Sequence, residues 1–201
     1  MGFIKISPTH TANLQKNGDN PAEVTTNYPD AVSCNNGSSY SGAYDGVLCL
    51  KIDVSQLKYR TITKAELKVK FFDADSAIGN TLYAYKISRA DWVYNQATYT
   101  IYKTGSNWTT AGGDYVTSSP AGGSFTVPSS PNGTWATFDI LAIIQDAIST
   151  KEGVVDVLIT MLPKSLSGAN DCQVRGIGYA TVEDRPVLEL TYNDSNFFQF
   201  M

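Results

Sequence analysis

Apolar and polar residues alternate along this chain in short runs, with turn-forming residues between one run and the next. In residues 65–72, Ala, Leu, Val and Phe take every second position, and glutamate or lysine stands between them. Alternate side chains of a strand point to opposite faces, so such a run buries one face and exposes the other. We expect about nine or ten strands. The clearest are 3–6, 47–53, 65–72, 81–87, 135–139, 154–161, 174–180 and 187–192, with a weaker one near Phe125.

One segment has the period of a helix instead. Its apolar residues fall at i, i+3, i+4, i+7 and i+8, and they are Ile140, Ile143, Ile144, Ala147 and Ile148. Asp139 can cap the start of this helix, and Gly153 lies just past its end. The polar face is too acidic to favour an anionic membrane, so we expect the helix to cover the sheets. The sequence therefore predicts an all-β fold, a two-sheet antiparallel β-sandwich with one short amphipathic helix.

Residues 1–192 are predicted to form a single domain, because no interdomain linker, repeat or block of like charge divides them. Long loops rich in Gly, Ser, Asn, Thr and Pro are expected over 17–46, 104–131 and 163–172. A chain of 201 residues is long enough to bury a core without disulfides or metals. Residues 193–201 are predicted to form an apolar C-terminal tail.

Composition argues against several classes of partner. The net charge of −4 lacks the basic footprint of a nucleic-acid-binding protein. No apolar run reaches the length of about 18 residues that a membrane-spanning helix needs. The chain begins at Met1 and enters a strand directly, which predicts synthesis in a host cytoplasm without a signal peptide.

Motifs for metals, cofactors and catalysis are missing. Cys34, Cys49 and Cys172 are not spaced as zinc ligands, so buried thiols are expected, and a Cys34–Cys49 disulfide stays open. His10 is the single histidine, and no nucleophile motif accompanies it. Glycine motifs for nucleotides are also missing. We expect no metal, no cofactor and no enzymatic activity.

A glycoside hydrolase needs only two carboxyl groups at a suitable separation. The candidates are Asp73, Asp75, Asp114, Asp139 and Glu183, but nothing in their spacing selects a pair. Hydrolysis therefore stays a minor alternative. A calcium loop after Asp73 is disfavoured, because Ala77 and Ile78 replace the ligand and the glycine that such a loop requires.

A distinctive stretch carries a resemblance to a known family. It contains Ala90-Asp91-Trp92, then Ala97-Thr98-Tyr99, then the segment GSNWTTAGGDY over 105–115. The segments LKIDVS (50–55), ITKAEL (62–67), FDI (138–140) and EDRPVL (183–188) accompany it in order. Together they resemble DNRLRE-type domains, which are also classed among carbohydrate-binding modules. Two features differ, because Tyr99 replaces a tryptophan and such modules normally belong to secreted multidomain proteins.

The resemblance implies a jelly-roll-like β-sandwich without catalytic apparatus. It also implies that Trp92 and Gly112-Gly113-Asp114 are largely structural. An aspartate after two glycines can cap a turn with its side chain.

Two functions follow as expectations. The first is a structural component of a virion, such as a phage capsid decoration or tail protein, with other virion proteins or further copies of itself as partners. An apolar tail favours an interface, and its apolar residues are Phe197, Phe198, Phe200 and Met201.

The second expected function is glycan binding, either within a virion or as an extracellular carbohydrate-binding module. Its candidate residues are Trp108, Tyr115, Tyr99 and Trp135, with Asp114 or Asn107 as hydrogen-bonding partners. Of the tryptophans, Trp92 and Trp135 are expected to lie in the core. The polysaccharide itself is not identified by the sequence.

Overall fold

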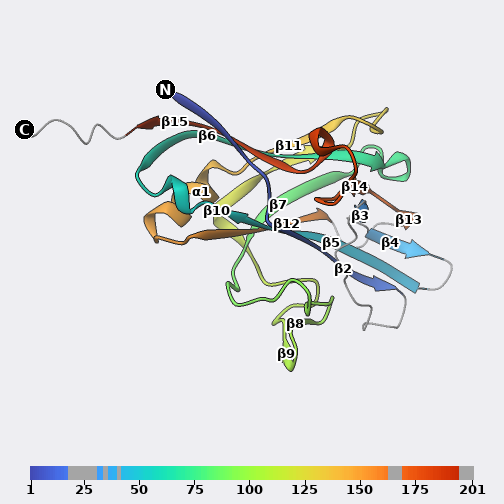
Figure 1. Ribbon diagram of the computed structural model, residues 1–201. Coiled ribbons are helices and arrows are strands. Elements are labelled where there is room, and N and C mark those ends of the chain that lie inside the picture. The colour runs from blue at the N-terminus through green and yellow to red at the C-terminus, as the bar shows by residue number, and fades with distance from the viewer. Residues whose placement is uncertain (18–30, 34–35, 40–41, 163–168, 195–201) are drawn as a thin grey trace, which may run out of the picture.

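The computed structural model describes residues 1–17, 31–33, 36–39, 42–162 and 169–194. Two antiparallel sheets pack against each other, and a small hairpin lies apart from them (Figure 1). The described residues contain one α-helix, α1 (Leu141–Ser149). They also contain three short 3-10 helices, η1 (Ser55–Leu57), η2 (Asp75–Ala77) and η3 (Val182–Asp184). No helix in this part of the chain is long and apolar enough to cross a membrane.

The first sheet, called sheet I, has the strand order β1-β15-β6-β14-β3, and β11 also pairs with β6, at residues 66–70. Its long central strand is β6, which pairs with β15 along most of its length. The strands are β1 (Gly2–Ile6), β3 (Ala31–Ser33), β6 (Arg60–Asp73), β11 (Trp135–Asp139), β14 (Gln173–Arg175) and β15 (Val187–Asp194).

The second sheet, called sheet II, has the order β10-β7-β12-β5-β4-β13, with β2 also paired to β5. Its strands are β2 (His10–Asn17), β4 (Asn36–Ser39), β5 (Gly42–Asp53), β7 (Thr81–Ile87), β10 (Tyr115–Thr126), β12 (Val154–Leu162) and β13 (Ala169–Asn170). The separate hairpin consists of β8 (Ile101–Lys103) and β9 (Ser106–Asn107).

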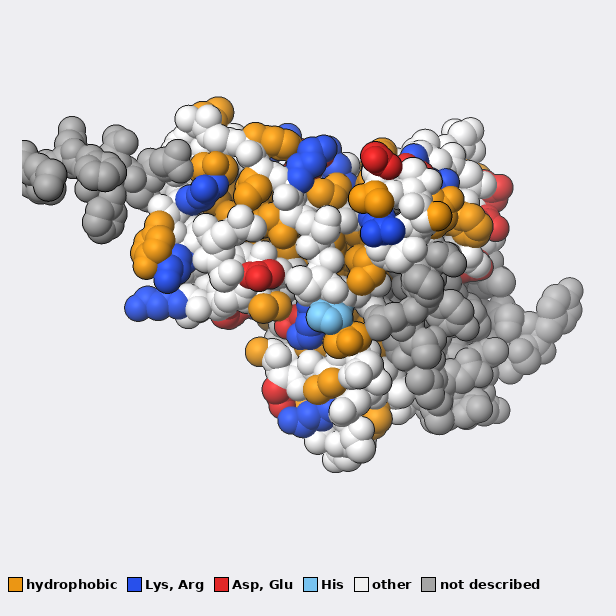
Figure 2. Space-filling view, in the orientation of Figure 1, with side chains coloured by type: hydrophobic (Ala, Val, Ile, Leu, Met, Phe, Trp, Pro, Cys, Tyr) orange, Lys and Arg blue, Asp and Glu red, His pale blue; other side chains and the backbone are white. Residues whose placement is uncertain are grey.

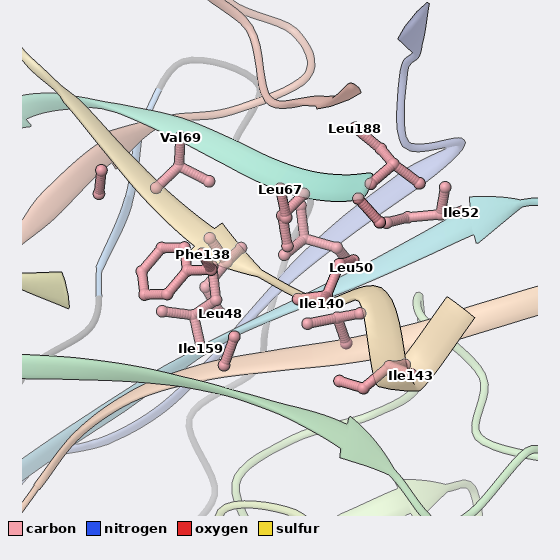
Figure 3. Close-up of a cluster of buried hydrophobic side chains, with 14 of the residues drawn as sticks. Leu48, Leu50, Ile52, Leu67, Val69, Phe138, Ile140, Ile143, Ile159 and Leu188 are labelled. Atoms are coloured by element: carbon pink, nitrogen blue, oxygen red, sulfur yellow. The ribbon is translucent and has the colours of Figure 1, made fainter. Parts of the chain in front are cut away.

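The main core lies between the two sheets. The apolar side of β6 is fully buried there, as its alternation predicts, and faces residues of β5 and β12. Figure 3 shows side chains from both sheets and from α1 pointing toward one another. They include Leu48, Leu50, Ile52, Leu67, Val69, Phe138, Ile140, Ile143, Ile159 and Leu188. Full burial of a leucine or isoleucine side chain contributes about 1.5–3 kcal/mol, so this cluster is the principal source of stability.

A second, smaller core covers the other face of sheet II. Residues 88–114, which we call the covering lobe, leave β7 and return at β10, and they carry β8 and β9 (Figure 1). Aromatic and apolar side chains of the lobe pack on those of the sheet. The cluster contains Ala12, Leu14, Val47, Cys49, Ile87, Trp92, Ala97, Tyr102, Trp108 and Leu158. Sheet II is therefore buried on both faces, whereas sheet I has one face turned to solvent.

The helix has the predicted period, but its C-terminal end differs from the one expected. Asp139 Oδ1 accepts a hydrogen bond from the backbone N–H of Leu141 at 2.9 Å, so it supports the start of the helix, although the N-cap residue itself is Ile140. At the other end, Lys151 adopts the left-handed conformation with φ 61°. Glycine is the usual residue there, and Gly153 lies two positions further on. The position just past the end of the helix, which was expected to be held by Gly153, is therefore held by Lys151.

Most predicted strands are present, but several expectations need correction. The loop expected over 17–46 contains β3, β4 and the start of β5. Residues 174–180 are not one strand, because β14 ends at Arg175 and is followed by a turn that the N–H of Tyr179 closes on the Gly176 carbonyl at 3.2 Å. The loop expected over 104–131 contains the long strand β10 (Tyr115–Thr126), which pairs with β7 through two register shifts. Cys49 and Cys172 are buried as expected, whereas Cys34 lies outside the described residues.

Candidate binding site on the outer face of sheet I

The structure places two of the predicted glycan-binding aromatics in the second core. Trp108 is 5% exposed, and its indole N–H donates to the carbonyl of Thr98 at 3.0 Å. Tyr99 is also buried, and its hydroxyl donates to Asp45 Oδ2 at 2.8 Å. Burial and the neighbouring carboxylate raise the pKa of Tyr99 far above its ordinary value. Neither ring presents a free face, which argues against direct contact between either ring and a sugar.

Asp114 acts within the protein, in the way that the resemblance implies. Its carboxylate accepts hydrogen bonds from the backbone N–H groups of Thr109 and Thr110 at 3.0 and 2.8 Å. It also accepts a hydrogen bond from Arg89 Nε at 3.3 Å. Burial alone would raise the pKa of Asp114, but these hydrogen bonds outweigh it, so the pKa lies below its ordinary value. The side chain therefore holds the end of the covering lobe closed.

The two glycines before Asp114 are required by close packing. Gly112 and Gly113 have φ values of 88° and 114°, which residues other than glycine rarely adopt. A Cβ on Gly112 would lie 3.0 Å from the Tyr99 ring, and one on Gly113 would lie 2.8 Å from Leu158. This part of the motif is explained by packing of the lobe.

The other two loop candidates lie on different elements, Tyr115 at the start of β10 and Asn107 in β9. Tyr115 is half-buried and stacks on Tyr85 with ring centroids 4.9 Å apart. Asn107 is exposed in the hairpin of the lobe. The predicted interface residues Phe197, Phe198, Phe200 and Met201 lie outside the described residues.

Trp135 lies on the outer face of sheet I and not in the core, which corrects the expectation for this residue. It begins β11 and pairs with Lys70 of β6. Along β11, Ala136 and Phe138 are fully buried, so the alternation turns Trp135 outward. Trp92, by contrast, is buried as expected. The outward position of Trp135 could have been predicted from the sequence, because Phe138 must point inward and Trp135 lies an odd number of residues before it.

A pocket of about 220 Å³ adjoins the Trp135 side chain, and we call it the Trp135 pocket. Sheet I and the segment before β15 supply its lining, which is Lys5, Lys68, Trp135, Glu183, Val187 and Glu189. Trp135 therefore shares the pocket with two lysines and two glutamates, and the ammonium of Lys70 lies 5.7 Å from the centre of its ring.

Ion pairs hold most of these charged groups in place. Glu189 accepts from Lys68 at 2.6 Å and pairs with Lys5 at 2.7 Å. Hydrogen bonds from Lys5 and Lys68 lower the pKa of Glu189, and the bond to Glu189 raises the pKa of Lys68 despite partial burial. Glu183 forms no ion pair with any described residue. Its carboxylate can therefore accept hydrogen bonds from a ligand.

The described residues give little support to other chemistry. They contain no group of three or more His, Cys, Asp or Glu side chains that could hold a metal. The ring of His10 packs on Tyr94 with centroids 3.8 Å apart. Among the candidate carboxylates, Asp139 supports the start of the helix and Asp114 caps the lobe.

Comparison with known proteins does not identify a family for this chain. A scan against known protein families finds no match for this chain, and a search of curated proteins finds no relative. The resemblance to DNRLRE-type domains therefore stays a prediction.

Proposed function

We propose that this protein is a non-catalytic β-sandwich that binds a neutral glycan in the Trp135 pocket. The observation that carries the proposal is the placement of Trp135. The other two tryptophans are buried in the second core, whereas this one lies on an open sheet face beside polar groups.

The chemistry of the pocket matches that of a sugar. A tryptophan ring offers a large apolar face with low conformational entropy, onto which the C–H groups of a sugar ring can pack. Ammonium groups of Lys5 and Lys68 donate hydrogen bonds, and the carboxylate of Glu183 accepts them. A sugar hydroxyl does both. Because Lys5 and Lys68 both contact Glu189, the lining is close to electrically balanced, which favours a neutral ligand.

Replacing Trp135 with alanine is expected to weaken glycan binding at least tenfold, because a tryptophan at the centre of a small site carries much of the binding energy. Retardation in native gels containing cellulose ether, galactomannan, laminarin or starch measures this. Phe72→Ala is the control, since Phe72 is an exposed aromatic of the same sheet that does not line the pocket. The proposal fails if no polysaccharide retards the protein, or if Trp135→Ala is retarded as strongly as the control.

A structural role in an assembly such as a virion is a second candidate. It is favoured by Phe3, which is 59% exposed on the edge strand β1. An edge strand has unpaired backbone N–H and C=O groups on one side, which can pair with another chain. Such pairing would put Phe3 beside a neighbouring copy.

If β1 is an assembly contact, Phe3→Lys should convert an oligomer of the full chain into a monomer. Light scattering measures the molar mass. Thr61→Lys serves as the control, because Thr61 is an exposed residue of β6, which is separated from β1 by the intervening strand β15. A molar mass that stays at one chain for the unmodified protein, from micromolar to millimolar concentration, would count against self-assembly through this edge.

A further inference from the structure

A second cavity, of about 600 Å³, lies where the C-terminal end of α1 meets η1. We call it the α1-end cleft. Its lining shares no residue with the Trp135 pocket and consists of Ser55, Lys58, Tyr59, Ile148, Ser149, Lys151, Glu152 and Gly153. Figure 2 shows basic side chains beside hydrophobic ones at the end of the molecule where Figure 1 places α1.

The two lysines of this cleft differ from most others in the protein. Lys58 and Lys151 form no ion pair with any residue that the structure describes. Seven other lysines do, namely Lys5, Lys51, Lys64, Lys68, Lys70, Lys86 and Lys103. The ring of Tyr59, which is 68% exposed, lies 4.7 Å from Lys58 Nζ and supports that ammonium at the rim.

The acid on the cleft wall does not neutralise these lysines. Glu152 Oε1 lies 2.8 Å from Lys86 Nζ and accepts a hydrogen bond from the hydroxyl of Thr150 at 3.1 Å. Asp53, which lies outside the lining, accepts from the backbone N–H of Ser55 at 2.9 Å. Both acids are therefore engaged elsewhere, and the ammonium groups of Lys58 and Lys151 face solvent.

Lys151 occupies its place at a conformational cost. With φ 61° it lies in the left-handed region, where a side chain is disfavoured and glycine is preferred. The turn is closed by backbone bonds from Lys151 N–H to the Ile148 carbonyl at 3.2 Å and from Glu152 N–H to the Ala147 carbonyl at 2.9 Å. Because these bonds involve backbone atoms alone, the turn does not need the lysine side chain.

We propose that the α1-end cleft binds a doubly charged oxyanion, such as the phosphate group of a phosphomonoester, between Lys58 and Lys151. Two ammonium groups that form no ion pair with a described residue match the charge of one dianion. Ile148 is half-buried in the lining and offers an apolar surface to the group that carries the ester. Such a role would give the lysine side chain a function at a position where glycine would be less strained.

The test is titration of the full chain with inorganic phosphate, inorganic sulfate and glucose 6-phosphate, followed by amide NMR shifts, with glucose as the uncharged probe. We expect shifts at Lys58 and Lys151 with each anion and none with glucose. Shifts with inorganic phosphate and glucose 6-phosphate but not with sulfate would also support the proposal and would show that the site selects phosphate. Equal shifts with glucose, or none with any anion, would overturn it.

Lys151→Gly separates ligand binding from folding. This variant should weaken anion binding about five- to tenfold, because it removes one charge-assisted partner, and it should raise the urea midpoint of unfolding, because it relieves the left-handed strain. Lys58→Met should weaken binding similarly, and Lys64→Met, which removes an exposed lysine of sheet I, should leave binding unchanged. Unchanged affinity in both Lys151→Gly and Lys58→Met would refute the site. A lowered urea midpoint in Lys151→Gly would assign the lysine to folding instead.

Discussion

Replacing Trp92 with alanine is expected to lower the free energy of unfolding by about 3–5 kcal/mol, the range for truncating a buried tryptophan. Trp92 is 2% exposed and belongs to the second core, where it joins the covering lobe to sheet II. Its ring also lies 4.4 Å from the ammonium of Lys51, so the variant loses a cation–π contact as well. Urea denaturation followed by circular dichroism measures the change.

Trp135→Ala is the matched control for this prediction. The same side chain is removed from the outer face of sheet I, where solvent already reaches it, and the expected loss is about 1 kcal/mol or less. If both variants lost the same free energy, the second core would not contribute to stability as the packing indicates.

Replacing Lys51 with methionine is expected to lower the free energy of unfolding by about 3–5 kcal/mol at pH 7, because it leaves a buried carboxylate without its partner. Lys51 Nζ lies 2.9 Å from Asp156 Oδ1, and the two side chains are 16% and 7% exposed. Lys51 and Asp156 lie opposite each other on β5 and β12. Urea denaturation at pH 7 measures the loss.

The same variant should show a distinctive dependence on pH. Burial raises the pKa of Asp156 above its ordinary value even with Lys51 opposing the shift, and removal of Lys51 raises it further. A carboxyl group with a raised pKa in the folded state favours folding while it is protonated, and this advantage disappears as the pH rises through that pKa. Lys51→Met should therefore be destabilised less at pH 4 than at pH 7.

The double variant Lys51→Met, Asp156→Leu supplies the control. With both charges gone, the difference in destabilisation between pH 4 and pH 7 should disappear. Much of the lost free energy of unfolding should also return, because no buried charge is left unpaired. A loss that stayed equal at pH 4 and pH 7 in Lys51→Met would show that packing of the lysine stem on Trp92, and not the charge of Asp156, explains its effect.

The Trp135 pocket illustrates what could be predicted and what could not. The alternation in β11 is local, and the burial of Phe138 and Ala136 on one side sends Trp135 to the other. A tryptophan is a common core residue, however. The expectation that Trp135 lies inside was based on its residue type and not on its position in the alternation of β11. The lining residues Lys5 and Glu189 come from β1 and β15, and only strand pairing brings them beside Trp135.

The covering lobe was harder to predict than the strands. Its motif, with Trp92, Trp108 and the two glycines before Asp114, is legible in the sequence as a distinctive pattern. That pattern could serve a ligand or a core equally well, because aromatic residues suit both. The second apolar face of sheet II decides between them, since Leu14, Val47 and Leu158 would be exposed without the lobe.

The sequence by itself determined the β-rich architecture, the position of the helix and which side of β6 is buried, because each depends on the spacing of residues along a short segment. Tertiary structure alone decided which charges are paired. Lys51 meets Asp156 across 105 positions of the chain, whereas Lys58 and Lys151 meet no acid among the described residues. Such pairings depend on how distant strands are placed side by side, and no local spacing encodes that.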